Sequence, residues 1–387
     1  MRACGLFAPA GIVLNGRSLY DDYSIRATPL NLGFGMTILV TGGLGFIGSA
    51  VVRRLLATTD EVVVNLDAET YAASREALGG RYGDPRHVHV KADVADAEAV
   101  AAVFARFRPR AVMHLAAESH VDRSIDGPAA FIRTNVVGTQ ILLEAARAHW
   151  QRLPPAERAA FRFHHVSTDE VFGALGPSDP PFHSGSRYDP RSPYAASKAA
   201  SDHLVRAWQH TYGFPAFVSN TTNNYGPWQF PEKLIPLIAL NALAGKPLPV
   251  YGKGENIRDW IHVEDHAEAL VAALFRGVPG ETYCFGARQE RTNLEVVRAI
   301  CRILDRLRPD PEGPRERLIT FVADRPGHDF RYAMDPGRSE AALGWRARLG
   351  FEEGLEGTLR WYLDNEAWWG PIRARPYAGE RLGRAAE

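Results

Sequence analysis

The sequence predicts an α/β fold built on a doubly wound parallel sheet. β-rich runs alternate with helical patterns between residues 37 and 221, and a glycine-rich turn follows the first run. After about residue 225, Pro and Gly punctuate shorter segments instead. Strands that alternate with helices indicate a parallel sheet covered on both faces. Together these observations predict a Rossmann-like sheet with a smaller, interleaved C-terminal substrate domain.

Each expected strand is a short apolar run that a helical segment separates from the next. Strands are expected at 37–40, 61–66, 87–90, 111–115 and 163–167, and helices at 96–107 and 129–149 among others. The later runs 217–221 and 281–285 can return to the same sheet. We therefore expect a tail at 1–35, a dinucleotide-binding domain at 36–222 with return segments near 260–285, a substrate domain mainly at 223–372, and a second tail at 373–387.

The composition excludes several classes of partner. The formal net charge of the chain is zero, which argues against nucleic acid or an anionic membrane as a partner. No apolar run reaches the ~20 residues that a membrane-spanning helix needs. Cys4, Cys284 and Cys301 lie far apart, without disulfide or metal-ligand spacing. We therefore expect a reducing, cytoplasmic location and no metal.

The first 35 residues carry no recognisable site. Arg2 and the apolar stretch after it faintly resemble a signal peptide, but Ala8-Pro9-Ala10 comes too early to be its cleavage site. Because the first strand-like run begins just after Met36, we expect residues 1–35 to be a tail or a misassigned start.

A glycine-rich turn stands between the first strand and the first helix. Gly42, Gly45 and Gly48 let the backbone turn tightly and approach a pyrophosphate, which a helix N-terminus also favours. A tight turn without a ligand is the alternative. Asp67 ends the second strand, 19 residues after Gly48, where its carboxylate can accept from both ribose hydroxyls and would repel a 2′-phosphate. We therefore expect NAD rather than NADP, with Asp93 holding the adenine amine unless it only caps a helix.

A Tyr–Lys pair follows at an expected helix start, where Ser192 is the cap and Pro193 lies in the first turn. Tyr194 and Lys198 are four residues apart, so they share one helix face. A nearby ammonium favours the phenolate and lowers the pKa of a tyrosine, which would make Tyr194 a base for a hydroxyl group. A packed tyrosine on a solvated helix face is the alternative.

Two adjacent carboxylates follow the fifth strand, in the run Thr168, Asp169 and Glu170. In doubly wound sheets the carboxyl ends of the strands line the ligand crevice, and carboxylates there are costly unless they are used or solvated. A polar loop with a capping Asp is the alternative. His164 and His165 precede this run without metal-ligand spacing, and we assign them to the strand with no further role.

These motifs together resemble the dTDP-glucose 4,6-dehydratases, from Met36 to about Pro371. The Thr-Asp-Glu run at 168–170 is the specific element. Related epimerases and decarboxylases share the Gly and Tyr–Lys motifs but usually carry small or hydroxyl residues in place of the two carboxylates. Further matching segments are 41–48, 114–124, 223–227, 231–236, 251–254, 257–260 and 324–329.

The resemblance implies a redox-neutral mechanism with NAD as cofactor and a nucleotide sugar as substrate. Tyr194, with Lys198 beside it, removes the proton from the carbon-4 hydroxyl while hydride passes to NAD. Glu170 then removes the proton on carbon 5, and a protonated Asp169 donates to the leaving hydroxyl at carbon 6. Hydride returns to carbon 6, so the product is the 4-keto-6-deoxy sugar nucleotide. The resemblance also implies a homodimer, and a hydrogen bond from Thr168 to the substrate.

The resemblance assigns ligand contacts by position. The cofactor contacts are Gly42, Gly45, Phe46, Ile47, Gly48, Asp67, Thr70, Asp93, Val94, Leu115, Ala116, Ala117, Ser119, Thr134, Tyr194, Lys198 and Asn224. The substrate contacts are Ser119, Thr168, Asp169, Glu170, Asn223, Lys233, Leu234, Pro249, Tyr251, Arg258, Asn293, Arg325 and His328. An arginine suits a diphosphate because its planar fork gives bidentate hydrogen bonds, and a surface ion pair is the alternative for both arginines.

The chain departs from the family at positions that bear on the nucleotide. Ala68-Glu69 stand where the family usually has Lys-Leu, Phe182-His183-Ser184 lacks the usual Thr-Glu, and Cys284 and Gln289 replace asparagines. We expect dTDP-glucose as substrate, with a UDP-, CDP- or GDP-linked glucose as the alternative. The competing functions are an epimerase or decarboxylase of the same scaffold and a non-catalytic NAD-binding regulator, and the intact catalytic groups disfavour both.

Overall fold

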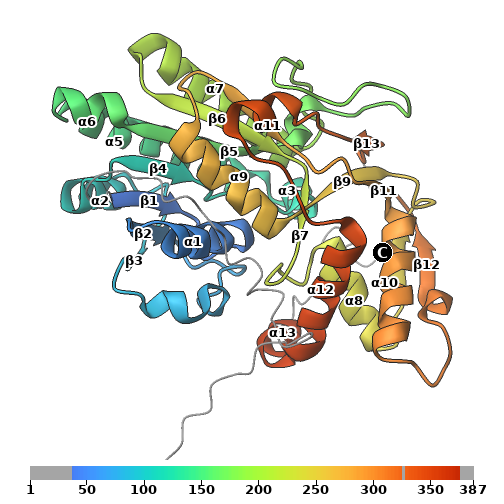
Figure 1. Ribbon diagram of the computed structural model, residues 1–387. Coiled ribbons are helices and arrows are strands. Elements are labelled where there is room, and N and C mark those ends of the chain that lie inside the picture. Colours follow the sequence, from blue (N-terminus) through green and yellow to red (C-terminus); the bar gives the residue numbers. More distant parts are fainter. Residues whose placement is uncertain (1–36, 325–326, 375–387) are drawn as a thin grey trace, which may run out of the picture. The chain divides into compact units, whose positions relative to one another are not determined.

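A parallel sheet of seven strands runs through the chain (Figure 1). The computed structural model describes residues 37–324 and 327–374. The tail or misassigned start expected at 1–35, the candidate substrate residue Arg325 and most of the second tail lie outside the described residues.

The strands of this sheet follow the order β10-β6-β5-β4-β1-β2-β3, and every neighbouring pair is parallel. They are β1 (Thr37–Thr41), β2 (Val62–Asp67), β3 (His87–Lys91), β4 (Ala111–His114), β5 (Arg162–Thr168), β6 (Ala216–Thr221) and β10 (Thr282–Phe285). The order runs outward from β1 in both directions, so the doubly wound α/β class is confirmed. The runs expected at 217–221 and 281–285 do return to the main sheet, as β6 and β10.

Helices cover both faces of the sheet, because alternate residues of a strand point to opposite faces. On β1, Ile38 and Val40 pack in the apolar cluster of α1 (Phe46–Thr58) and α9 (Val263–Arg276), which lie in direct contact (Figure 1). Leu39 packs in the opposite cluster. The helices of that cluster are α2 (Ala97–Phe107), α5 (Thr139–Gln151) and α7 (Pro193–Tyr212). No helix within 37–324 or 327–374 is long and apolar enough to cross a membrane.

The segment expected as one helix at 129–149 is divided in the structure. It consists of α4 (Pro128–Phe131), a π-helix η2 (Ile132–Gly138) and α5, with α3 (Val121–Asp126) before them. A π-helix often lies at a functional site, and its wider turn leaves no mark in the hydrophobic periodicity. Here it carries the buried Asn135, whose Nδ2 donates to Ser197 Oγ at 2.8 Å and to the backbone O of Glu118 at 3.0 Å.

The chain after β6 builds a smaller region. Strands β11-β9-β13 are bonded in that order, β7 also pairs with β9, and β8 pairs with β12. These strands are β7 (Asn223–Tyr225), β8 (Leu248–Tyr251), β9 (Ile257–His262), β11 (Glu290–Thr292), β12 (Ile319–Val322) and β13 (Arg331–Tyr332). An apolar cluster joins the helices α8 (Leu234–Leu243), α10 (Asn293–Leu307) and α12 (Phe351–Asp364), which stand together in Figure 1. Since α9 and β10 lie between β9 and β11 in sequence but pack with the large sheet, the two regions interleave.

Short helices complete the described elements. They are α6 (Pro155–Ala160), α11 (Gly337–Leu343), α13 (Glu366–Arg373) and the 3-10 helices η1 (Glu76–Gly83), η3 (Asp169–Phe172) and η4 (Arg315–Leu318). Helix α11 packs on α9 and β10, and α13 packs on α12. The last part of the described chain thus contacts both regions.

We expect Phe163→Ala to destabilise the fold strongly. Phe163 on β5 is fully buried, and its ring lies 5.6 Å from that of Phe214. Truncation leaves a cavity that costs about 3–5 kcal/mol of unfolding free energy. Phe321→Ala is the matched control, because Phe321 is 56% exposed, and it should cost no more than about 0.5 kcal/mol. Denaturant unfolding measures both losses, and equal midpoints would contradict the packing of β5.

Candidate active site

A cavity of about 360 Å³ opens where the carboxyl ends of β1, β4, β5 and β6 meet. Among its lining residues, Gly42 follows β1, Leu115 follows β4, Asp169 follows β5 and Thr222 follows β6. Parallel strands bring their carboxyl ends to one edge of the sheet, and ligands of doubly wound sheets bind there. Segments from four parts of the sequence thus form one site.

The glycine-rich turn brings the backbone close to this cavity. Gly42 has a φ of +73°, and a Cβ there would lie 2.7 Å from the backbone N of Ala116. A Cβ on Gly48 would lie 2.0 Å from the backbone O of Gly42. Gly45 is the N-cap of α1, and Phe46 in its first turn lines the cavity. A close backbone beside a helix N-terminus fits the pyrophosphate of NAD.

Asp67 ends β2 beside this turn and is buried. Its Oδ2 accepts from the backbone N of Leu44 at 2.9 Å, and its Oδ1 accepts from that of Glu69 at 2.8 Å. Burial raises the pKa of Asp67, although these backbone hydrogen bonds oppose the shift. Each carboxyl oxygen keeps a further lone pair, so the carboxylate can also accept a hydrogen bond from a ribose hydroxyl.

Asp93 lines the same cavity after β3. Its Oδ1 accepts from the backbone N of Ala95 at 2.8 Å, and its Oδ2 lies 3.1 Å from a guanidinium nitrogen of Arg133. The N-cap of α2 is Asp96, whose carboxylate accepts from two backbone N–H groups. The alternative that Asp93 caps this helix is therefore wrong.

The two neighbouring carboxylates lie in the 3-10 helix η3, directly after β5. Thr168 caps this helix and accepts from the backbone N of Glu170 at 3.3 Å. Asp169 is 2% exposed, and its Oδ2 has no hydrogen-bond partner within the described ranges. Burial raises the pKa of Asp169 well above its usual value, the charge of Glu170 raises it further, and Arg258 opposes both. A carboxyl group in such surroundings carries a proton that it can donate.

Tyr194 lies in the first turn of α7 and lines the cavity. Ser192 caps the helix by accepting from the backbone N of Ala195 at 3.0 Å. Burial raises the pKa of Tyr194, the charge of Glu170 raises it as well, and the hydrogen bond with Thr168 lowers it. The expected lowering of this pKa by a nearby ammonium is therefore wrong for the protein as described, because burial dominates.

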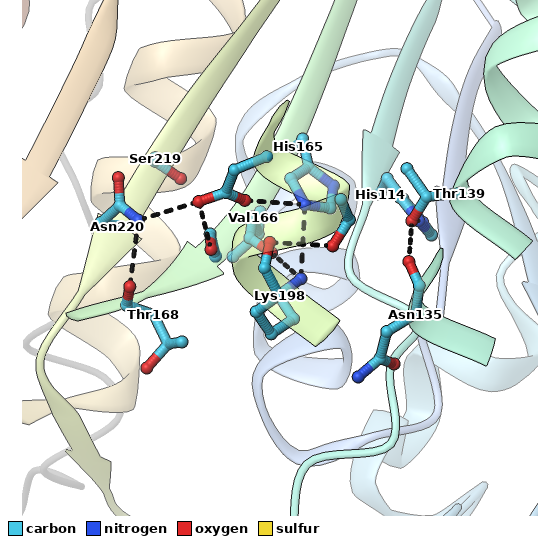
Figure 2. Close-up of polar contacts among 12 residues, drawn as sticks. His114, Asn135, Thr139, His165, Val166, Thr168, Lys198, Ser219 and Asn220 are labelled. Atoms are coloured by element: carbon cyan, nitrogen blue, oxygen red, sulfur yellow. Dashed lines mark hydrogen bonds and ion pairs between the residues drawn. The ribbon is translucent and has the colours of Figure 1, made fainter. Parts of the chain in front are cut away.

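Lys198 is held against β5, one helical turn from Tyr194. Its Nζ donates to the backbone O of Val166 at 2.8 Å and lies 3.4 Å from Nε2 of His165 (Figure 2). Burial lowers the pKa of Lys198 to about 8, and the charge of Asp202 opposes this shift. The ammonium form therefore persists at neutral pH.

The cavity brings together most of the candidate ligand contacts. Every residue expected to contact the cofactor lines it. The candidate substrate residues that line it are Ser119, Thr168, Asp169, Glu170, Asn223 and Lys233. Those outside its lining are Leu234, Pro249, Tyr251, Arg258, Asn293 and His328.

The candidates outside the lining belong to the smaller region. The ring of Tyr251 on β8 lies 6.0 Å from that of His328. Arg258 on β9 is buried, and its guanidinium lies 4.3 Å over the ring of Tyr332. Its positive charge nevertheless lowers the pKa of Asp169. Arg258 is thus coupled electrostatically to the carboxyl group of Asp169.

The structure adds a polar cluster at the cavity wall that the sequence did not indicate. The guanidinium of Arg123 lies 3.7 Å over the ring of Tyr71 and donates to Oε2 of Glu232 at 3.0 Å. The hydroxyl of Tyr71 donates to the other oxygen of Glu232 at 3.3 Å. These residues follow three different strands, so no local motif links them. Tyr71 and Glu232 line the cavity, and the further unanticipated lining residues are Leu66, Ala68, Ala72, Ala73, Ala92, Glu118, Val166, Ser167, Thr221, Thr222, Gln229 and Phe230.

Three features in one cavity define the class of this protein. A glycine-rich turn follows β1, an acidic residue ends β2, and a Tyr–Lys pair stands on one face of α7. This combination defines an NAD-dependent enzyme of the extended short-chain dehydrogenase/reductase class. Residues 39–358 also match the family model described as GDP-mannose 4,6 dehydratase.

Individual relatives narrow this class. The chain is 56% identical to a dTDP-glucose 4,6-dehydratase from Escherichia coli, over 90% of this chain and 99% of that protein. It is 59% identical to a dTDP-glucose 4,6-dehydratase from Neisseria gonorrhoeae, over 85% of this chain and 96% of that protein. The dTDP-glucose 4,6-dehydratase from Streptomyces venezuelae, solved with NAD bound, matches with a TM-score of 0.79 at 43% identity, over 87% of this chain and 100% of that one. The chain therefore belongs to the dTDP-glucose 4,6-dehydratase family, whose members are NAD-dependent hydro-lyases.

We expect Gly48→Ala to weaken the binding of NAD. The new Cβ would lie 2.0 Å from the backbone O of Gly42, so the turn must open and move away from the pyrophosphate. Affinity measured by calorimetry should fall at least about tenfold, roughly 1.4 kcal/mol. In the control Gly80→Ala, a Cβ meets nothing within 4 Å, and affinity should not change. A Gly48→Ala protein that retains full affinity would show that the close approach is not required.

Proposed function

We propose that the chain converts dTDP-glucose to dTDP-4-keto-6-deoxyglucose and water. The observation that carries this proposal is the buried Asp169 beside Glu170, in the same cavity as Tyr194. An epimerase needs no such acid and base pair. The glycine turn and Asp67 would hold NAD in this cavity, where NAD would supply a reversible hydride acceptor and a positive charge that favours the phenolate of Tyr194.

Tyr194 would handle the proton of the carbon-4 hydroxyl. The tyrosine is placed at the cavity wall by the first turn of α7, and Thr168 hydrogen-bonds to it and favours its phenolate. Lys198, one turn further along, adds a positive charge to the same wall. Oxidation of carbon 4 to a ketone acidifies the proton on carbon 5, which prepares the elimination.

In the elimination of water, Glu170 would act as the base and Asp169 as the acid. Glu170 removes the proton from carbon 5, and Asp169 gives its proton to the hydroxyl on carbon 6, which leaves as water. The raised pKa of Asp169 supports its role as the acid. The proton on Glu170 returns to carbon 5 when hydride reaches carbon 6. Tyr194 then holds one proton more and Asp169 one proton fewer than at the start, and proton exchange with solvent restores both groups, so the transfers balance.

We propose that the two regions divide the ligands. Residues 36–222, with the return segments near 260–285, would bind NAD, and residues 223–372 would mainly bind the nucleotide of the substrate. Lys233 supports this division, because it lines the cavity from the smaller region and donates from Nζ to the backbone O of Ser119 at 2.9 Å. Arg258 and Arg325 are proposed to bind the diphosphate.

A panel of nucleotide-linked glucoses tests the reaction and the nucleotide together. We expect mass spectrometry to show loss of water, with at least about a tenfold higher kcat/KM for dTDP-glucose than for UDP-glucose, roughly 1.4 kcal/mol. NADH should not accumulate in proportion to product, because hydride returns within each cycle. Equal efficiencies would refute the nucleotide assignment alone. An epimer without loss of water, or no turnover at all, would refute the proposed reaction.

Glu170→Gln should separate the two halves of the reaction. The amide keeps the shape of the side chain but removes the base, so enzyme-bound NADH should still form while water loss falls by about 10²–10⁴. Entry of solvent deuterium at carbon 5 should fall in parallel. In the comparison variant Tyr194→Phe, bound NADH should not form. Dehydration by Glu170→Gln at a near wild-type rate would show that Glu170 is not the base.

We infer a homodimer formed through the helices beside the cavity. Ile125, Ile132 and Val137 are 42%, 48% and 42% exposed. They lie on α3 and the π-helix, both of which pack on α7, where the small side chains of Ala196 and Ala207 are also exposed. This surface can receive a second copy of the chain without displacing large side chains.

Analytical ultracentrifugation tests this surface, with an expected mass of twice 42.7 kDa. Val137→Glu should weaken the dimer at least about tenfold, because it places a charge in an apolar interface. Val278→Glu is the matched control, since Val278 is 56% exposed elsewhere and should leave the dimer intact. A wild-type monomer, or equal effects of both variants, would contradict the inferred interface.

The free thiols support a cytoplasmic location, which we also propose. Cys284 and Cys301 are buried and not joined in a disulfide. Unpaired buried cysteines are typical of reducing compartments.

A further inference from the structure

A third polar residue continues the helix face of Tyr194 and Lys198. Asp202 lies four residues after Lys198 on α7, so the three share one face. Asp202 is 0% exposed, and so is His165 on β5, which contacts it. A buried charge is costly unless it is paired, so the partners of Asp202 are informative.

Three hydrogen-bond donors converge on one oxygen of the Asp202 carboxylate. Its Oδ2 accepts from Ser167 Oγ at 2.9 Å, from the hydroxyl of Tyr188 at 2.7 Å and from Asn220 Nδ2 at 3.3 Å. Its Oδ1 lies 3.2 Å from Nε2 of His165. Burial alone would raise the pKa of Asp202, but its hydrogen-bond donors and the nearby positive charge outweigh burial, so the pKa lies below its ordinary value. Asp202 therefore carries a negative charge inside the protein.

The imidazole of His165 stands between this carboxylate and the ammonium of Lys198. Its Nε2 lies 3.2 Å from Oδ1 of Asp202. The same nitrogen lies 3.4 Å from Lys198 Nζ (Figure 2). Burial, and then the charge of Lys198, lower the pKa of His165 to about 4, so the ring is neutral. The charge of Asp202 is the influence that opposes deprotonation of the buried Lys198.

We propose that Asp202, acting through His165, is a positioning residue that keeps Lys198 charged and directed at β5 during catalysis. A buried ammonium without a counter-charge loses its proton more readily. Burial already disfavours the phenolate of Tyr194, and the loss of a positive charge one helical turn away would disfavour it further, so proton transfer at the carbon-4 hydroxyl would slow. The inference rests on the proposed function, since it assigns a role within that reaction.

Other titratable groups face this assembly from neighbouring elements. On β4, the ring of His114 lies 5.2 Å from that of His165, and burial lowers its pKa, so it is neutral. From the segment before α7, the hydroxyl of Tyr188 accepts from Arg206 at 3.0 Å. The groups on the cavity side are Tyr194, Asp169 and Glu170. Asp202 is the carboxylate that contacts His165. Removing its charge therefore tests directly whether it keeps Lys198 protonated.

Asp202→Asn removes the charge and keeps the shape of the side chain. In NAD-loaded enzyme we would measure kcat/KM against pH, where the alkaline limb reports loss of the proton from Lys198. This limb should move to lower pH by at least about one unit, and turnover at the wild-type optimum should fall by more than about tenfold. The deficit should narrow as the pH is lowered, because Lys198 regains its proton. A purely structural defect would not recover in this way.

Tyr188→Phe is the matched control, because it removes one hydrogen bond to the same carboxylate but leaves the charge. Its alkaline limb should stay within about 0.3 unit of the wild type. A folded, NAD-loaded Asp202→Asn enzyme with an unshifted limb overturns the inference. If Asp202→Asn does not fold, His165→Asn interrupts the same contact, and an unshifted limb there overturns it equally. A wild-type protein that turns over no nucleotide-linked glucose would overturn the proposed function instead.

Discussion

The parallel pairing of β1, β4, β5 and β6 is the constraint on which the site depends. Parallel strands end at one edge of the sheet, so the segments that follow them must share the space beyond that edge. The glycine turn, Thr168, Asp169 and the segment after β6 reach one cavity for this reason. Helix α7 then packs against both β5 and β6 and adds Tyr194 and Lys198 from one face.

Two buried carboxyl groups of this protein, those of Asp169 and Asp202, have different protonation states. The side chain of Asp169 accepts from one side-chain donor, Thr168, and is driven toward its neutral form. Oδ2 of Asp202 accepts from three side-chain donors, and this carboxylate stays charged. The two carboxyl groups are both buried, so depth alone does not decide their state. What decides it is the number of donors that each side chain meets.

Local patterns predicted those parts of the fold and site that depend on short-range spacing. The helical spacing of Tyr194 and Lys198 and the order of strand and glycine turn are visible within a few residues. Contacts between distant segments were not predicted, as with Arg123 beside Glu232, and neither was the pKa of Tyr194, which depends on burial. The spacing of Asp202 from Lys198 was a usable signal, because it repeats the interval from Tyr194 to Lys198. This spacing alone does not indicate a role for Asp202, because the contact with His165 depends on how β5 packs against α7.

The interleaving of the two regions has a consequence for folding during synthesis. The ribosome releases β9 of the smaller region before β10, the outermost strand of the large sheet. Until residue 285 has emerged, β6 is an unpaired edge strand, and such edges are prone to aggregation. The large sheet therefore cannot be completed until β9 of the smaller region has been synthesised, and the edge of β6 stays open to wrong pairing while the intervening segment is made.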